Sequence, residues 1–146
     1  MKALLINGSP HAHGCTYTAL GVVADELNKA DVATEIVHVG HKDIRGCIGC
    51  YTCRELGRCV FDKDMVNEVA KKFEEADGLI ISSPVYYAGP NETLVSLLNR
   101  RFAASEHSRT SFDIRIVYGR TLITLVGSKM MHANLPDSIG CARRLR

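Results

Sequence analysis

Short apolar runs alternate with longer amphipathic stretches along the first hundred residues of the chain. The apolar runs end in turn-forming residues, as buried strands of a parallel sheet do, and they lie at 2–6, 32–39 and 79–81. The amphipathic stretches repeat apolar residues at helical intervals, and they lie at about 16–28, 62–75 and 91–98. A last strand is expected within 120–126, after which the pattern fades. The alternation predicts an α/β fold with a parallel sheet between two helical layers.

Two of the predicted helices carry a polar residue suited to capping their first turn. Asp62 or Asp64 is expected to cap the helix at 62–75, and Asn91 the helix that follows it. The second strand, at 32–39, mixes polar residues with apolar ones, which favours a place near an edge of the sheet.

Length and composition are those of one globular domain, which we expect to span residues 1–146. Hydrophobic residues make up 46% of the chain, and the net charge of +2 implies no polyanionic partner such as nucleic acid. The N-terminal apolar run is too short for a membrane span, so we expect no membrane association and a cytoplasmic location. Residues 100–146 carry 9 Lys and Arg against 3 Asp and Glu, whereas 1–99 carry 9 against 13. The segment 101–146 is therefore an atypical C-terminal part of the same domain.

Three loops follow predicted strands, at 7–16, 41–60 and 83–91. The carboxyl ends of parallel strands meet at one edge of a sheet, where ligands of open α/β folds bind. The sequence thus predicts one composite site formed by these loops.

The first loop joins a strand to a helix N-terminus, where unpaired backbone N–H groups favour an anion. Ser9 and Thr16 offer hydroxyl groups beside it. Neither the dinucleotide pattern G-x-G-x-x-G nor a Gly-Lys-Ser/Thr triplet is present, which favours a single phosphate over a diphosphate or triphosphate. An ordinary capped turn is an equally good interpretation of the loop alone.

The third loop contains two adjacent aromatic residues, Tyr86 and Tyr87, among proline and small residues. They suit the binding of a flat ring, through aromatic faces and free backbone N–H groups. A rigid turn whose tyrosines cover the edge of the core explains the same residues.

Four cysteines lie within thirteen residues of the second loop: Cys47, Cys50, Cys53 and Cys59. The compact spacing and the neighbouring glycines suit a four-thiolate iron–sulfur cluster. Zinc is a second possibility, although zinc pairs of the Cys-x2-Cys kind usually recur farther along a chain. Free or redox-active thiols are the third.

Three motifs in order resemble those of the flavodoxin-like NAD(P)H-dependent FMN reductases and iron–sulfur flavoproteins, over about residues 1–100. They are Ile6-Asn7-Gly8-Ser9-Pro10 with Gly14-x-Thr16, then Gly46-Cys47-Ile48-Gly49-Cys50-Tyr51-Thr52-Cys53, then Ser83-Pro84-Val85-Tyr86-Tyr87. The resemblance implies a flavodoxin-like three-layer sandwich with strand order 2-1-3-4 and a fifth strand that is weak or missing.

The resemblance also assigns residues to cofactors. The phosphate of FMN would be surrounded by Ser9, His11, Gly14, Cys15 and Thr16. The isoalloxazine ring would be lined by Pro84, Val85, Tyr86, Tyr87, Ala88 and Gly89. A [4Fe–4S] cluster would be held by Cys47, Cys50, Cys53 and Cys59. Relatives commonly carry Arg and Asn where this chain has His11 and Cys15, which predicts a weaker hold on the phosphate.

The expected function is that of an FMN-binding oxidoreductase or electron-transfer flavoprotein. It would take electrons from NAD(P)H and pass them to a cluster or another acceptor, with no acid–base residue of its own. We expect a homodimer or a higher homo-oligomer. Two alternatives stay open: a metal-binding or thiol-sensing module without flavin, and a non-functional remnant whose altered C-terminal segment prevents stable folding.

Overall fold

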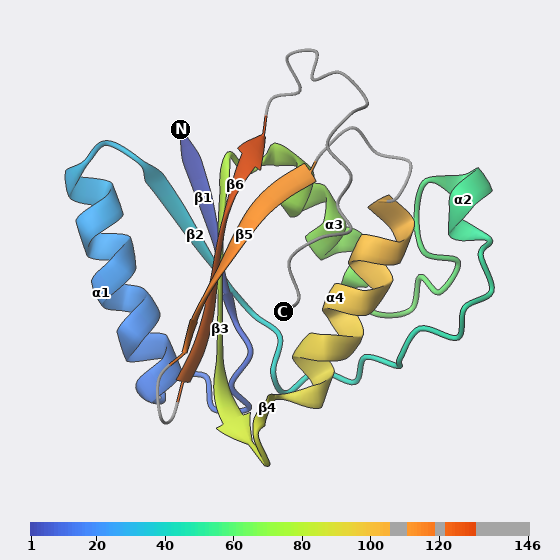
Figure 1. Ribbon diagram of the computed structural model, residues 1–146, viewed down its shortest axis with the longest axis horizontal. Coiled ribbons are helices and arrows are strands. Elements are labelled where there is room, and N and C mark those ends of the chain that lie inside the picture. Colours follow the sequence, from blue (N-terminus) through green and yellow to red (C-terminus); the bar gives the residue numbers. More distant parts are fainter. Residues whose placement is uncertain (106–110, 119–121, 131–146) are drawn as a thin grey trace, which may run out of the picture.

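The computed structural model describes residues 1–105, 111–118 and 122–130, and the side chains of residues 1–104. The strands of its central sheet are β1 (Lys2–Asn7), β2 (Ala33–His38), β3 (Gly78–Tyr86), β4 (Gly89–Pro90), β5 (Ser111–Tyr118) and β6 (Leu122–Met130). The helices are α1 (Cys15–Lys29), α2 (Cys53–Leu56), α3 (Val66–Glu75) and α4 (Glu92–Ser105). Figure 1 shows the sheet edge-on, with α1 on one face and α3 and α4 on the other. This three-layer arrangement confirms the α/β class.

The first three strands are parallel, in the spatial order β2-β1-β3. In the middle, β1 is buried from Ala3 to Asn7, as its unbroken apolar run predicted. β2 is half-buried and pairs with β1 at the end of the sheet, so its predicted edge position is confirmed. The parallel register sets Asn7 beside His38 and Ser82, which brings the three strand ends to one edge.

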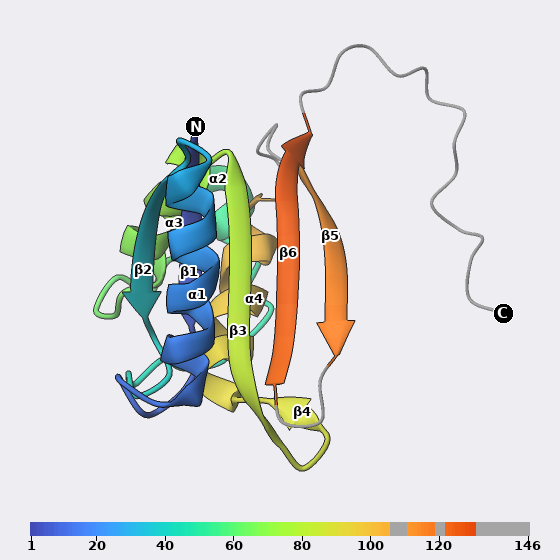
Figure 2. The ribbon, with the colours of Figure 1, turned by 90° about the vertical axis from the view of Figure 1, so that its left-hand side faces the viewer.

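The strands after α4 differ from the prediction of an all-parallel sheet. β6 pairs with β3 in the antiparallel direction and β5 pairs with β6 in the same way, which gives the order β2-β1-β3-β6-β5 (Figure 2). The residues between Tyr118 and Leu122 are too few for a parallel crossover, which needs a dozen or more, so the two strands form an antiparallel pair. The predicted order 2-1-3-4 is confirmed, and the strand expected within 120–126 holds the fourth position with the opposite direction. The fifth strand, predicted to be weak or missing after it, is instead β5, which precedes it in the chain.

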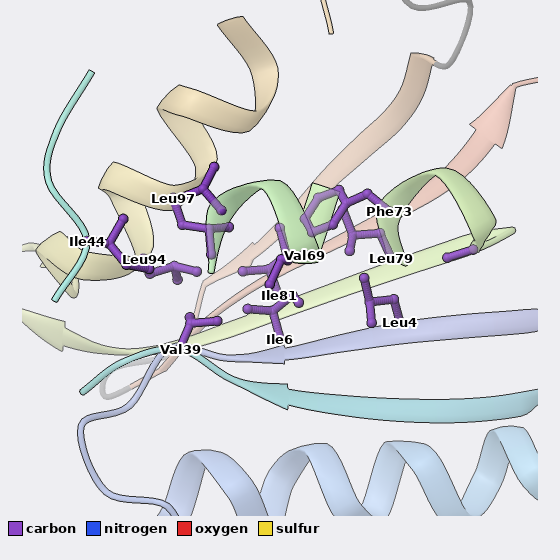
Figure 3. Close-up of a cluster of buried hydrophobic side chains, with 12 residues drawn as sticks. Leu4, Ile6, Val39, Ile44, Val69, Phe73, Leu79, Ile81, Leu94 and Leu97 are labelled. Atoms are coloured by element: carbon purple, nitrogen blue, oxygen red, sulfur yellow. The ribbon is translucent and has the colours of Figure 1, made fainter. Parts of the chain in front are cut away.

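The larger part of the core lies between the sheet and helices α3 and α4 (Figure 3). Its fully buried side chains include Leu4, Ile81, Phe73 and Leu97, drawn from two strands and two helices. Full burial of one such side chain contributes about 1.5–3 kcal/mol. A smaller cluster, centred on Leu5 and Leu20, fixes α1 to the opposite face.

α1 begins and ends within one residue of its predicted bounds, whereas α4 continues seven residues past its predicted end and α2 lies in a segment predicted to be a loop. α3 begins four residues later than predicted. This helix begins at Val66, after Met65, and has no side-chain hydrogen bond from its capping position. Asp64 instead accepts a hydrogen bond from the Val66 N–H at 3.2 Å and directs its other oxygen to Arg100. Asn91 caps α4 as predicted, since its Oδ1 accepts the Thr93 N–H at 2.8 Å. No helix in the described ranges is both long enough and apolar enough to cross a membrane.

Candidate functional site at the strand ends and the cysteine pocket

The first loop turns tightly after β1 and is held by its own polar groups. The Asn7 Oδ1 accepts the Ser9 N–H at 3.0 Å, and the Ser9 Oγ accepts the His11 N–H at 3.2 Å. These bonds direct the loop toward the N-terminus of α1. The capping residue there is Gly14, with no side-chain hydrogen bond to the helix and no acidic residue in the first turn. The positive end of the helix dipole is thus free of a competing carboxylate.

The end of β2 packs directly against this loop. His38 Nε2 lies 2.7 Å from the Ser9 carbonyl oxygen, and the Val39 N–H donates to the Asn7 carbonyl at 2.9 Å. A Cβ atom on Gly40 would lie 2.2 Å from the Ser9 carbonyl oxygen, so only glycine permits this approach. The His41 ring stacks on the His38 ring at 4.3 Å between centroids. Partial desolvation and the neighbouring His38 lower the pKa of His41.

The third loop is a hairpin between β3 and β4 that extends beyond the sheet (Figure 2). Its two turn residues, Tyr87 and Ala88, have φ angles of +45° and +65°. Both angles are positive, as in the type I′ turn usual for two-residue hairpins, in which glycine or asparagine is preferred. The Tyr87 side chain is fully exposed, and that of Tyr86 is about half exposed.

Hydrogen bonds join this hairpin to the other two strand ends. The Gly8 N–H donates to the Ser82 carbonyl at 2.8 Å, and the Asn91 Nδ2 donates to the Gly40 carbonyl at 3.2 Å. The Ser83 Oγ accepts the Asn91 N–H at 2.9 Å. The first and third loops and the end of the β2 segment, at Val39 and Gly40, therefore form one continuous surface at the carboxyl edge of the sheet.

The residues that the resemblance assigned to FMN differ in exposure. Ser9 and Thr16 are buried at 5% and 4% exposure, whereas His11 and Cys15 are exposed. On the third loop, exposure rises from the half-buried Pro84 and Val85 to the exposed tyrosines and Ala88, and Gly89 is again half-buried. The two buried hydroxyl residues are thus integral to the fold of the first loop.

The four clustered cysteines line one pocket of about 360 Å³ on the outer side of α4. The chain reaches it by running from the strand-end edge along α4 to α2 (Figure 1). Cys47 and Cys50 are exposed, Cys53 is half-buried and Cys59 is buried. The rest of the lining is mostly apolar, with Ile48, Val60 and Phe61 among it, and it includes two cations, Arg54 and Arg100.

Cys59 is the most firmly held of the four. Asn67, in the first turn of α3, accepts the Cys59 N–H and donates to the Cys59 carbonyl, each at 3.0 Å. The Cys59 Sγ accepts a hydrogen bond from Arg100 Nε at 3.2 Å. Backbone and thiol are therefore both fixed by helices that belong to the core.

The other thiols have weaker local support. Cys53 Sγ donates to the Ala103 carbonyl of α4 at 3.4 Å. Hydrogen bonds from the backbone N–H and the hydroxyl of Thr52, at the start of α2, lower the pKa of Cys50. Within the described ranges, no three His, Cys, Asp or Glu side chains converge tightly enough to hold a single metal ion.

The strand-end surface and the cysteine pocket are distinct places along the same helix. Asn91 at the start of α4 belongs to the first, and Arg100 to the second. Nine residues of helix separate them by about 13 Å. The predicted gathering of loops is thus confirmed for 7–16 and 83–91, which meet at Val39 and Gly40 just before the loop 41–60, whereas the cysteines of that loop lie farther along α4.

Several residues of these sites were not singled out from the sequence. Each of them contacts a residue 8 to 41 positions away in the chain, and they are Gly40, His38, Asn67 and Arg100. For Arg100 the sequence did contain a signal, because this charged residue follows Leu94 and Leu97 at helical spacing, where an apolar residue is expected. Such a residue needs a buried partner.

The sheet order, the two helical layers and the loop surface at the carboxyl edge define a flavodoxin-like α/β protein. Residues 1–131 match the sequence profile of the NADPH-dependent FMN reductases, and the chain belongs to this family. The match extends thirty residues beyond the region over which the sequence motifs had suggested it.

Individual relatives point the same way. An iron-sulfur flavoprotein of Methanocaldococcus jannaschii is 36% identical over 115 residues, which are 79% of this chain and 57% of that protein. One of Archaeoglobus fulgidus is 36% identical over 100 residues, 68% of this chain and 45% of that protein. The FMN reductase (NADPH) of Escherichia coli is 28% identical over 104 residues, 69% of this chain and 50% of that protein. The chain spans about half the length of these curated relatives, and no solved structure matches it.

Proposed function

We propose that this chain binds FMN at the strand-end surface and acts in an NAD(P)H-dependent flavin oxidoreductase or electron-transfer flavoprotein. One observation carries the proposal: hydrogen bonds join the chain segments at the ends of β1, β2 and β3 into one surface. This surface lies beside the N-terminus of α1, which has no side-chain cap. One anion site at a helix N-terminus suits the single phosphate of FMN. Family membership supports the same cofactor.

In this proposal each loop has a separate task. The phosphate is held by backbone N–H groups of the first turn of α1, with Ser9 and Thr16 as hydroxyl donors and Gly14, His11 and Cys15 around them. The flavin ring lies against the hairpin residues Pro84, Val85, Tyr86, Tyr87, Ala88 and Gly89. When bound, the flavin supplies two-electron and one-electron redox chemistry, and the protein supplies position and electrostatics.

The cysteine pocket is the second part of the proposal, as the site of a [4Fe–4S] cluster held by Cys47, Cys50, Cys53 and Cys59. The four thiols line one pocket, and curated relatives are named iron-sulfur flavoproteins. A cluster there would accept electrons singly from the flavin site at the other end of α4. A reduced cytoplasmic setting belongs to this proposal, because cluster ligands must be free thiolates.

A comparison of two flavins tests the phosphate site. Removal of the two hydroxyls in S9A/T16A should weaken FMN binding by at least about ten- to a hundredfold, which is the loss expected for a single charge-assisted hydrogen bond worth about 1.5–3 kcal/mol. Riboflavin, which has no phosphate, should bind the variant and the wild type alike. T18A is a matched control, because the Thr18 hydroxyl is used within α1, on the Gly14 carbonyl. Equal weakening of FMN and riboflavin would refute the assignment.

Anaerobic purification tests the cluster and the activity together. We expect flavin absorbance, iron and acid-labile sulfide in the wild type, and loss of the flavin absorbance on addition of NADPH. C50S should lose the iron and keep the flavin, whereas C15S, in the first loop, should keep its iron. Flavin without iron in the wild type would leave a simple flavin reductase.

The same preparation distinguishes the rival functions. Metal without flavin would favour a metal-binding or thiol-sensing module, and aggregation would favour a remnant that does not fold. The homo-oligomeric state and the electron acceptor stay predictions, the first of which sedimentation measurements can test.

A further inference from the structure

Arg100 is a buried cation whose guanidinium is fully engaged. Its side chain is 1% exposed, and all five of its N–H donors have acceptors. Two donors bind the Asp64 carboxylate, and two bind the carbonyls of Arg45 and Phe61. The fifth, on Nε, points to Cys59 Sγ at 3.2 Å.

This arrangement fixes the direction of the Nε–H group. A guanidinium is planar and rigid, so four bonds to Asp64, Arg45 and Phe61 leave its fifth donor no freedom to turn away from the sulfur. Cys59 cannot move away either, since Asn67 holds its N–H and its carbonyl. The N–H···S contact is therefore built into the fold from both sides.

A donor aimed at a ligating sulfur has a specific consequence for an iron–sulfur cluster. Reduction adds one electron to the cluster and breaks no bond, and part of the added charge resides on the thiolate sulfurs. A hydrogen bond from a cation strengthens as that charge grows, so it favours the reduced form. Hydrogen bonds to the sulfurs are among the factors that set cluster potentials.

We propose that Arg100 is a positioning residue that holds Cys59 for the cluster and raises the reduction potential of that cluster through its Nε–H···S bond. The proposal rests on the function given above, in which Cys59 is a ligand. The competing explanation is purely structural: Arg100 would only join α4 to the segment 59–64 through the ion pair with Asp64.

Variants of the ion pair separate the two explanations. In R100Q the Asp64 carboxylate loses its partner, which endangers folding, so the main variant is the double R100M/D64L. Replacement of a buried ion pair by apolar residues of similar size is often tolerated. The matched control is D64N, which breaks the same ion pair and keeps the Nε–H donor.

The measurement is a potentiometric titration of the 146-residue chain, prepared anaerobically with its cluster and followed by electron paramagnetic resonance. At a fixed applied potential we expect the reduced-to-oxidised ratio of R100M/D64L to fall about tenfold, a shift of about 59 mV to lower potential. D64N should keep the wild-type potential or move to a higher one, because it removes a negative charge and keeps the donor.

Each outcome bears on one proposal or both. If the wild type and R100M/D64L both bind iron and their clusters have the same reduction potential, the role of Arg100 is overturned and the cluster assignment stays intact. An equal fall in D64N and the double variant would overturn it too, since the ion pair alone would then explain the shift. Failure of only the double variant to take up iron would support the positioning of Cys59 by Arg100. Absence of iron from the wild type would overturn both proposals.

Discussion

Single residues set the spacing of the strand-end surface, and Gly40 is the clearest case. Its Cα faces the backbone of the first loop so closely that an added Cβ would lie 2.2 Å from the Ser9 carbonyl oxygen and 2.3 Å from that of Gly8. Both atoms belong to the backbone, so no side-chain rotation can relieve the overlap. The position of Ser9 relative to β2 therefore depends on the absence of a side chain at residue 40.

Substitution of Gly40 by alanine should destabilise the protein and weaken FMN binding. We expect a loss of about 1–3 kcal/mol in the free energy of unfolding, as for other overpacked sites, because the first loop must shift. Urea unfolding of the flavin-free protein measures the first effect, and titration with FMN the second.

Gly21 provides the matched control, because it lies in α1 and an added Cβ meets nothing within 4 Å. G21A should be neutral or stabilising by up to about 1 kcal/mol, as expected from the helix propensities of the two residues. If G40A were as stable as G21A and bound FMN normally, the close approach of the two loops would be wrong.

At the residue scale, the role of a side chain could be predicted from the sequence where its hydrogen-bond partner is near in the chain. The capping role of Asn91 followed from its place before an apolar stripe, and its acceptor contact is only two residues away. The contact of Arg100 with Cys59 joins residues 41 positions apart, and no periodicity in the sequence pairs them. Long-range side-chain contacts depend on the folded arrangement of α4 and the loop.

At the scale of elements, the hairpin between β3 and β4 carries conformational strain. Tyr87 and Ala88 both adopt the left-handed region, at a cost of roughly 1–2 kcal/mol for each non-glycine residue. Such strain often marks a binding loop. The hairpin presents the exposed Tyr87 beside the strand-end surface, where the flavin ring is proposed to lie.

Substitution of Ala88 by glycine should relieve part of this strain. We expect A88G to raise the free energy of unfolding by about 0.5–1 kcal/mol, because the positive φ costs glycine nothing, although the unfolded chain gains some entropy. Urea unfolding at neutral pH measures the change.

A70G is the control for the loss of a methyl group, since Ala70 lies within α3. It should destabilise the protein by about 1 kcal/mol. A loss of stability in A88G as large as that in A70G would contradict the left-handed turn.

At the scale of the whole molecule, local pattern predicted the layers and the first half of the sheet better than the second. The continuous apolar run of β1 could belong only to a buried central strand, and its parallel partners followed from the intervening helices. Beyond α4, the connection from Tyr118 of β5 to Leu122 of β6 is too short to hold a helix, and a connection of this length joins an antiparallel pair. The antiparallel pairing can be predicted only if both β5 and β6 are recognised in the sequence, and only β6 had a recognisable apolar pattern.

One polar network joins three elements of the molecule on the face covered by α3. The Glu35 carboxylate of β2 binds the Lys72 ammonium of α3 and the Lys2 ammonium of β1. The two lysines, Lys72 above all, hold the pKa of Glu35 below its ordinary value of 4.5. Glu35 in turn raises the pKa of both lysines.

Because the pKa of Glu35 is depressed in the folded state, its charge stabilises the fold above the unfolded value of 4.5, and this contribution is lost as the pH falls through the folded pKa. E35Q should therefore be less stable than the wild type at neutral pH, with a difference that vanishes in acid. Urea unfolding of both proteins from neutral pH to about pH 3 measures it. E26Q, which removes an exposed pair within α1, should change stability little at any pH. A wild-type advantage over E35Q that persisted unchanged in acid would show that Glu35 acts through packing rather than charge.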